Sequence, residues 1–185
     1  ATHYSIMQVE GIEQNAIMID SVSKRFSMCG ARIGWVVSKN KEVMKSILKF
    51  AQARLSPPTY SQIGAERAFD VPETYFEEVL KEYTQRRNVL IEELQKVQGV
   101  RVSMPKGAFY CIAELPVENA EDFCIWLLDN FSVNNETVML APAEGFYATE
   151  GLGRNQVRIA YVLEKEKIVK AIHILADALK KYNNS

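Results

Sequence analysis

The first part of the chain alternates apolar and polar positions in a way that predicts two short strands and a helix. The segments AIMIDS (residues 16–21) and IGWVVS (33–38) place apolar side chains between small or polar ones, which is typical of β-strands, and a glycine-containing turn joins them. Residues 41–55 instead repeat apolar side chains at helical spacing, and the sequence Ser-Pro-Pro at 56–58 ends that helix. We expect the double proline to mark a break in the organisation of the chain.

A long amphipathic helix is predicted between Pro72 and Gly99. Proline is favoured at the first position of a helix, where its missing N–H is not needed, and glycine is favoured just after the last turn. The apolar residues between them fall on one helical face: Phe76, Val79, Leu80, Tyr83, Leu90, Leu94 and Val97. This pattern predicts a helix that packs on one side and is solvated on the other.

The rest of the chain predicts further strands and two more helices. The segments with the pattern of strands are residues 100–104, 108–115, 138–142 and 156–162. Asn119 is a good N-cap for a helix over residues 120–131. A final amphipathic helix presents one apolar stripe made of Ile168, Ile172, Leu175 and Leu179. We expect an α+β layer in which helices cover one face of a small sheet.

The composition excludes several classes of partner. The chain has 185 residues, of which 48% are hydrophobic, so it can bury a substantial core. Its 22 basic and 23 acidic residues leave a net charge of -1, and no global field therefore attracts nucleic acid or an anionic membrane. No apolar run approaches the roughly 18 residues that indicate a membrane span. We expect neither nucleic acid nor a membrane as a partner.

The cysteines and the N-terminal residues point to a cytoplasmic protein. Cys29, Cys111 and Cys124 are odd in number and widely spaced, with no C-x-x-C pair and no histidine set for zinc. We therefore expect reduced thiols and no metal site. The first residues lack the basic and apolar regions of a secretion signal, and the start at Ala1 is a hint that upstream residues belong to the natural protein.

The segment SVSKRFSMCGARIGW, residues 21–35, carries the main candidate chemistry. Lys24 directly follows a predicted strand, and a lysine amine becomes a useful nucleophile where a site desolvates it or places a cation such as Arg32 nearby. The planar fork of Arg32 fits a phosphate, and Ser21 and Ser23 add hydroxyl donors. These groups suit a phosphorylated carbonyl compound. Solvated surface charge is the alternative on spacing alone, and the G-x-x-x-x-G-K-[ST] order of a nucleotide P-loop is absent.

This segment resembles the lysine segment of class I and II aminotransferases, the fold-type-I enzymes that use pyridoxal 5'-phosphate. Their pattern runs S-x-S-K, seven residues, then R-x-G, and residues 21–34 follow it. PKGAFY from Pro105 and VMLAPAEGFYATEGLGRNQVRIAYV from Val138 also resemble small-domain segments of this family, in the same order. The likeness covers essentially the whole chain, and the aspartate-type enzymes are the nearest.

The resemblance implies a role for each candidate residue. Lys24 forms the imine with pyridoxal phosphate and serves as the general base. Ser21 and Arg32 hold the cofactor phosphate, with Ser23 a weaker candidate for the same cup. By the resemblance, Arg158 binds the α-carboxylate of the substrate, whereas its spacing alone favours a strand arginine that extends to solvent.

The resemblance also implies a fold class and a division into domains. The expected class is α/β with an α+β small domain: residues 1–56 are the C-terminal remnant of the large cofactor-binding domain, and residues 57–185 are the small C-terminal domain. Strands in the first part have exposed edges, which invite pairing with another chain, and the family implies a homodimer. Family members are much longer, and their glycine-rich phosphate turn, ring-stacking aromatic and pyridine-pairing aspartate have no counterpart here.

The expected function is that of the C-terminal part of an aminotransferase. The parent protein exchanges an amino group between an amino acid, aspartate-like by resemblance, and a 2-oxo acid, whereas the isolated chain is expected to be inactive because the missing residues complete the site. Two alternatives stay open. The chain is a non-catalytic module that retains the fold, or the parent is a pyridoxal phosphate-dependent lyase or synthase, since these relatives share the lysine segment.

Overall fold

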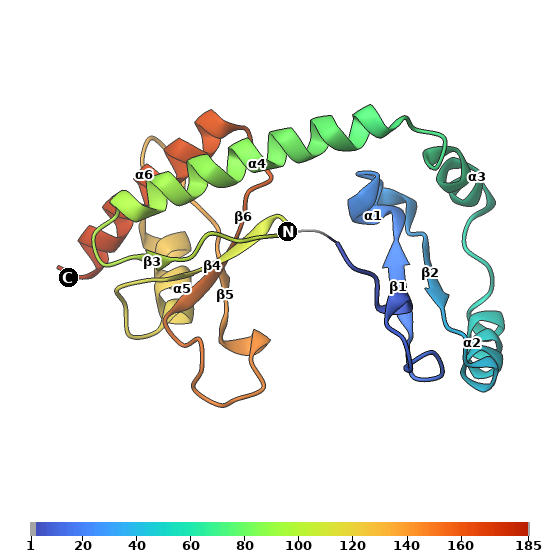
Figure 1. Ribbon diagram of the computed structural model, residues 1–185. Coiled ribbons are helices and arrows are strands. Elements are labelled where there is room, and N and C mark those ends of the chain that lie inside the picture. Colours follow the sequence, from blue (N-terminus) through green and yellow to red (C-terminus); the bar gives the residue numbers. More distant parts are fainter. Residues whose placement is uncertain (1–2, 185) are drawn as a thin grey trace. The chain divides into compact units, whose positions relative to one another are not determined.

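A computed structural model describes residues 3–184 and divides the chain into two compact units. The first unit is Ala1–Tyr75 and the second is Phe76–Ser185. Figure 1 draws the first unit in blue to blue-green and the second from green to red. The boundary at residue 56 that the sequence suggests concerns the domains of a longer parent protein, and it stays a prediction.

The first unit is built on a two-stranded antiparallel sheet. Its elements are η1 (Ile6–Gln8), β1 (Met18–Ser21), α1 (Val22–Arg25), η2 (Cys29–Ala31), β2 (Gly34–Val37), α2 (Lys41–Arg54) and α3 (Thr59–Ala68). Met18 lies opposite Val37, and Ser21 lies opposite Gly34. Both predicted strands and the helix at 41–55 are confirmed.

Helix α3 is the element that the hydrophobic pattern does not predict. Its N-cap is Pro58, which has no side chain that can cap a helix, and Gly64 lies in its middle, where glycine disfavours helix. Only Ala65 and Ala68 are buried, so no clear apolar stripe marks the segment in the sequence. The double proline therefore ends α2 and directly precedes another helix.

The second unit is a four-stranded antiparallel sheet with three long helices. Its elements, with α4 starting just before the division, are α4 (Glu73–Lys96), β3 (Arg101–Val102), β4 (Tyr110–Glu114), α5 (Ala120–Asn130), β5 (Ala141–Pro142), η3 (Glu144–Phe146), β6 (Gln156–Ala160) and α6 (Lys165–Tyr182). The strand order is β3-β4-β6-β5 (Figure 1). Every predicted strand and helix of this part is confirmed, with strands shorter than the sequence pattern indicates.

Alternation along the strands decides which face of this sheet is buried. Cys111 and Ala113 on β4, with Val157 and Ile159 on β6, are buried, whereas Tyr110, Ile112 and Arg158 point to the other face and are half-buried. The buried face belongs to one continuous cluster with residues of the three helices, including Leu90, Leu94, Phe123, Leu127 and Leu175. This confirms the predicted α+β layer.

The helix ends follow the sequence signals. The Asn119 side chain accepts a hydrogen bond from the Glu121 amide at 2.8 Å, which makes it the N-cap of α5 as predicted. Pro72 directly precedes α4, and Gly99 follows it with φ of +81°, a conformation that glycine adopts without strain. Within residues 3–184, no helix combines the length and the apolar character needed to cross a membrane.

The three cysteines are free. Cys29 is exposed, whereas Cys111 and Cys124 are buried in the core of the second unit. Burial raises the pKa of Cys111 to about 11. Burial, together with the nearby Glu121 carboxylate, likewise raises the pKa of Cys124 to about 11. The two buried thiols are therefore protonated and unreactive at neutral pH.

Candidate functional site

The candidate lysine lies in the one-turn helix that follows the first strand. Ser21 ends β1 in an extended conformation and caps the one-turn helix α1, its hydroxyl oxygen accepting a hydrogen bond from the Ser23 amide at 3.3 Å. Because the Ser21 oxygen acts as an acceptor here, its hydroxyl hydrogen can be donated to another group. Lys24 is the third residue of α1, and its side chain is exposed. The strand–turn–lysine order expected from the sequence is thus present.

Arg32 occupies a strained position just before the second strand. Its φ of 56° is left-handed, and its Nη1 donates a hydrogen bond to the Cys29 carbonyl at 2.9 Å. The Val22 amide donates to the Ile33 carbonyl at 3.2 Å, which ties the start of α1 to the residue after Arg32. The lysine segment and the arginine are therefore held side by side by the β1–β2 pairing.

Gly34 permits the close approach of these two strands. A Cβ atom on Gly34 would lie 2.9 Å from the Asp20 carbonyl oxygen and 3.3 Å from the Ser21 Cβ. The glycine of the R-x-G pattern thus has a steric reason, since any side chain would push β2 away from β1.

Ser21, Ser23 and Arg32 line one open cavity of about 560 Å³ in the first unit. Two hydroxyl groups and one guanidinium fork form a donor set that fits a phosphate group. Asp20 also lines the cavity, but its carboxylate accepts a hydrogen bond from the Ser21 amide at 2.7 Å. The remaining lining is largely apolar, with Trp35 and Ile47 among it. Lys24 is not part of this lining, although it follows Ser23 directly in α1.

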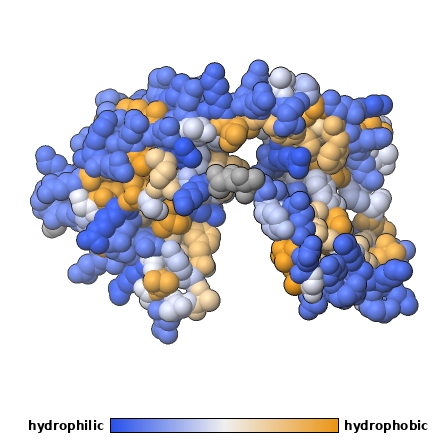
Figure 2. Space-filling model, in the orientation of Figure 1, coloured by the Kyte–Doolittle hydropathy of each residue, from blue (hydrophilic) through white to orange (hydrophobic). Residues whose placement is uncertain are grey.

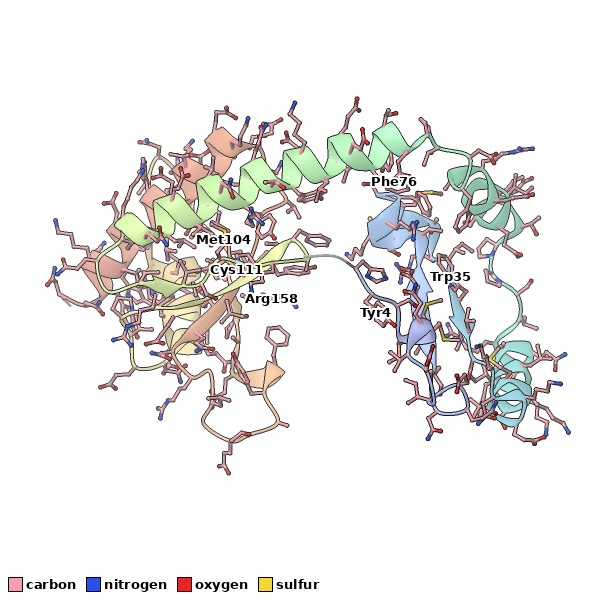
Figure 3. The ribbon with its side chains drawn as sticks, in the orientation of Figure 1. Tyr4, Trp35, Phe76, Met104, Cys111 and Arg158 are labelled. Carbon is pink, nitrogen blue, oxygen red and sulfur yellow. The ribbon has the colours of Figure 1, made fainter. Side chains whose placement is uncertain are left out.

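Arg158 lies in the second unit, in the middle of β6, and is half-buried (Figure 3). Its guanidinium carbon is 4.6 Å from the centroid of the Tyr110 ring and 4.5 Å from that of Phe146. Within residues 3–184 the structure shows no hydrogen bond or ion pair to this side chain. Arg158 is thus not simply extended into solvent, and its N–H donors stay available to an external acceptor.

Other cations near Arg158 are already neutralised. Arg158, Lys167 and Lys170 all line a mainly apolar cavity of about 1080 Å³ beside α6. Lys167 forms an ion pair with Glu164 at 3.0 Å, and Lys170 forms one with Glu136. Among the described residues of this cavity, Arg158 is the cation without a carboxylate partner, which makes it the natural binding group for an added anion.

The sequence did not assign the two rings around Arg158 to the candidate site. Tyr110 is equally typical of a core residue, and Phe146 lies in a glycine-containing loop whose position no sequence pattern reveals. The strand register is the missing information: Ile112 lies opposite Arg158, which puts Tyr110 diagonally next to it on the same face. The structure thus gathers Ser21, Ser23 and Arg32 in the first unit and surrounds Arg158 with aromatic rings in the second.

Most of this chain is similar to known proteins. Residues 3–175 match the family model for aminotransferase class I and II. Aspartate aminotransferase of Pyrococcus horikoshii is 30% identical over 183 residues, which are 97% of this chain and 44% of that protein. The (5-formylfuran-3-yl)methyl phosphate transaminase of Methanocaldococcus jannaschii is 31% identical over 180 residues, 96% of this chain and 46% of that protein.

Solved structures of aminotransferases have a fold similar to that of this chain. An aromatic aminotransferase from Pyrococcus horikoshii superposes with a TM-score of 0.82 at 26% identity, covering 99% of this chain and 48% of that one. An α-aminoadipate aminotransferase from Thermus thermophilus, complexed with N-(5'-phosphopyridoxyl)-L-leucine, gives 0.77 at 26% identity, covering 89% of this chain and 42% of that one. These likenesses confirm the predicted fold class. The chain spans less than half the length of each of these relatives.

Proposed function

Because this chain belongs to the class I and II aminotransferase family, we propose that the whole protein is a pyridoxal phosphate-dependent aminotransferase that exchanges an amino group between an amino acid and a 2-oxo acid. The observation that carries this proposal is the cavity shared by Ser21, Ser23 and Arg32, since Lys24 of the S-x-S-K pattern directly follows Ser23 in α1. The family match and the phosphopyridoxyl-leucine complex of the Thermus thermophilus relative support the choice of cofactor.

In the first unit, three residues bind the cofactor phosphate and Lys24 carries the chemistry. The guanidinium of Arg32 and the hydroxyl of Ser21 bind the cofactor phosphate, with Ser23 as a further donor. Lys24 holds the cofactor through its Nζ atom. When bound, pyridoxal phosphate withdraws electrons from the substrate α-carbon and so makes its proton removable. Once the amino group of the substrate has displaced Lys24 from the cofactor, the free Lys24 amine would take that proton as the general base.

In the second unit, Arg158 binds the α-carboxylate of the amino acid or the 2-oxo acid. A guanidinium binds a carboxylate through two parallel N–H···O hydrogen bonds, which fixes the orientation of the substrate as well as its position. Its lack of a carboxylate partner among the described residues supports this role, since no internal ion pair has to break first.

Substrate, assembly and location extend the proposal. We infer an aspartate-like amino acid as substrate, because aspartate aminotransferases are among the relatives. We further propose a cytoplasmic homodimer, in which residues 1–56 belong to the large domain and 57–185 form the small one. Exposed apolar side chains such as Phe50 and Tyr60 support an interface in the first unit. The isolated 185-residue chain is expected to lack activity, because residues that would stack on the pyridine ring and pair with its nitrogen are absent from it.

Borohydride reduction of the complete enzyme tests the cofactor assignment. Reduction should fix a pyridoxyl group on Lys24, as read by peptide mapping, and Lys24→Arg should abolish the label, whereas the control Lys41→Arg should keep it. A label on another lysine would refute the assignment. No label together with no activity would favour the non-catalytic module, and activity without amino transfer would favour a lyase or synthase.

A further inference from the structure

Arg158 differs from the other arginines whose guanidinium lies over a ring. Arg86 lies 5.6 Å from the Tyr83 ring centroid, but it uses its donors internally, to the Glu82 carboxylate at 2.7 Å and to the Val162 carbonyl at 2.6 Å. Arg158 lies closer to each of two rings, at 4.6 Å and 4.5 Å, and its side chain forms no hydrogen bond or ion pair within residues 3–184. The two rings orient the guanidinium, and its N–H groups form no hydrogen bonds to other described residues.

The two rings come from β4 and from the turn after β5, the two strands on either side of β6. Tyr110 belongs to β4, where it pairs with Ala160, two residues beyond Arg158 on the same face. Phe146 ends η3, the turn after β5, and β5 pairs with β6 through Ala141 opposite Arg158. The sheet order β4-β6-β5 therefore supplies one ring from each neighbour. Neither ring depends on the other for its place.

Phe146 is exposed, yet the segment around it is held in place. Its side chain is 56% exposed, so burial in the core does not fix its position. The next residue, Tyr147, donates a hydrogen bond to the Gln156 side chain on β6 at 2.7 Å and packs on Gly153, where no Cβ would fit. These contacts anchor the turn to β6 and so keep Phe146 next to Arg158.

We propose that Tyr110 and Phe146 are positioning residues that hold the guanidinium of Arg158 in one plane for a substrate carboxylate; this inference rests on the proposed function. The rings attract the cation through their negative faces and restrict its rotation. The N–H edge of the guanidinium stays open. A carboxylate that binds there does not have to order a long flexible side chain, and preorganisation of this kind strengthens binding.

Substitutions at position 146 in the complete enzyme test the inference. Phe146→Ala should raise the KM for both the amino acid and the 2-oxo acid by about threefold to tenfold, the range expected for a cation–π contact. The value of kcat and the cofactor content should change little. Tyr110→Ala should act in the same direction. Leu152→Ala, which removes another exposed apolar side chain of the same loop, is the matched control and should leave KM unchanged.

Two further variants separate the ring from its volume. Phe146→Tyr keeps an aromatic face and should restore the original KM, whereas Phe146→Leu keeps apolar bulk without a π face and should resemble Phe146→Ala. If Phe146→Leu keeps the original KM, simple packing explains the site and the proposal is overturned. A loss of cofactor together with kcat in Phe146→Ala would equally overturn it, because the ring would then be structural.

A chemical readout makes the inference independent of turnover. Phenylglyoxal modification of Arg158, followed by mass spectrometry, should become faster in Phe146→Ala, because one face of the guanidinium is uncovered. A 2-oxo acid should protect Arg158 in the unchanged enzyme. An unchanged modification rate in Phe146→Ala would contradict the role of the ring. If the enzyme transfers no amino group from any amino acid, the proposed function fails, whereas the modification rate still reports on the rings.

Discussion

The two units bury their apolar residues to very different degrees. Of the buried apolar residues that the structure describes, the first unit holds Ala16, Val22, Phe26, Ala65 and Ala68, whereas the second holds a continuous cluster of 18. Large apolar side chains of the first unit reach the surface instead, including Ile19 at 78% and Phe50 at 76% exposure. Figure 2 shows apolar surface in the region of β1 and β2. The second unit therefore contains its own core, while the first presents apolar surface suited to further contacts.

The same contrast extends to the candidate functional groups. In the first unit, the set of residues that we propose for phosphate binding depends on backbone geometry: a short strand pair, a one-turn helix and a left-handed residue. In the second unit, Arg158 is oriented by side chains on a sheet that rests on the main core. We infer that changes in the local backbone weaken cofactor binding more than substrate binding. Changes in side chains should weaken substrate binding more than cofactor binding.

The largest expected effect concerns the difference between the cores. Leu127→Ala removes a fully buried side chain from the cluster of the second unit and should lower the free energy of unfolding by about 2 to 5 kcal/mol. Leu48→Ala, at a site that is 57% exposed in the first unit, should change it by less than about 0.5 kcal/mol. Urea titrations of both variants measure the difference. Equal losses of unfolding free energy would mean that the core of the first unit stabilises the fold as much as that of the second.

The next effect separates the roles of the two arginines in the complete enzyme. Arg158→Ala should raise the KM for amino acids at least tenfold, consistent with about 1.5 to 3 kcal/mol for a hydrogen bond to a charged group, while cofactor content stays intact. Arg32→Ala should instead weaken the binding of pyridoxal phosphate by a similar factor. Steady-state kinetics and cofactor absorbance distinguish them. The assignment is wrong if Arg158→Ala loses cofactor and keeps its substrate affinity.

A smaller effect concerns the backbone of the first unit. Gly34→Ala places a Cβ 2.9 Å from the Asp20 carbonyl, and the separation of β1 and β2 that follows should cost about 1 to 3 kcal/mol. It should also weaken cofactor binding, since Ser21 and Arg32 move apart. Gly30→Ala is the control, because a Cβ there meets open space. Thermal unfolding of the chain and titration of the complete enzyme with cofactor provide the measurements. Identical behaviour of the two variants would contradict the steric argument.

The smallest effect concerns the thiols. At neutral pH, Cys29 should react quickly with a thiol reagent, and Cys111 and Cys124 only after unfolding, because the pKa of each buried thiol is raised to about 11. The folded state keeps these two protons to higher pH than the unfolded state does, so the stability they provide is lost as the pH rises from about 8.5 towards about 11. Thiol counting and unfolding at pH 7 and pH 10 check both statements. Rapid reaction of all three thiols in folded protein would exclude the buried positions.

The sequence predicted most of the second unit because its signals are strong and local. Each signal comes from one element alone: the apolar stripe of α4 and the alternation of β4 are periodic patterns, and Asn119 is the cap of α5. Helix α3 was missed because Gly64 and the two prolines outweigh a weak apolar pattern. Local signals of this kind predict single helices and strands, and they do not predict how those elements pair or pack.

The residues of the candidate site also differ in how far the sequence alone could identify them. The lysine segment is contiguous, so its residues could be named from spacing and resemblance, and their roles stay a prediction. Tyr110 lies 48 residues before Arg158 in the chain, and Phe146 lies in a turn without a clear sequence signal. Only the pairing of β4, β5 and β6 brings both rings to Arg158. Contacts across a sheet depend on register, which the sequence of one strand does not specify.

The left-handed backbone at Arg32 opposes the stability of the chain to the phosphate-binding role that we propose for this residue. An L-residue with a side chain pays about 1 to 2 kcal/mol in this conformation, which glycine would avoid. Arg32→Gly would relieve the folded chain of strain and at the same time remove the guanidinium that we propose for the phosphate. Selection for thermal tolerance alone would therefore favour glycine at this turn, and selection for catalysis would keep the arginine.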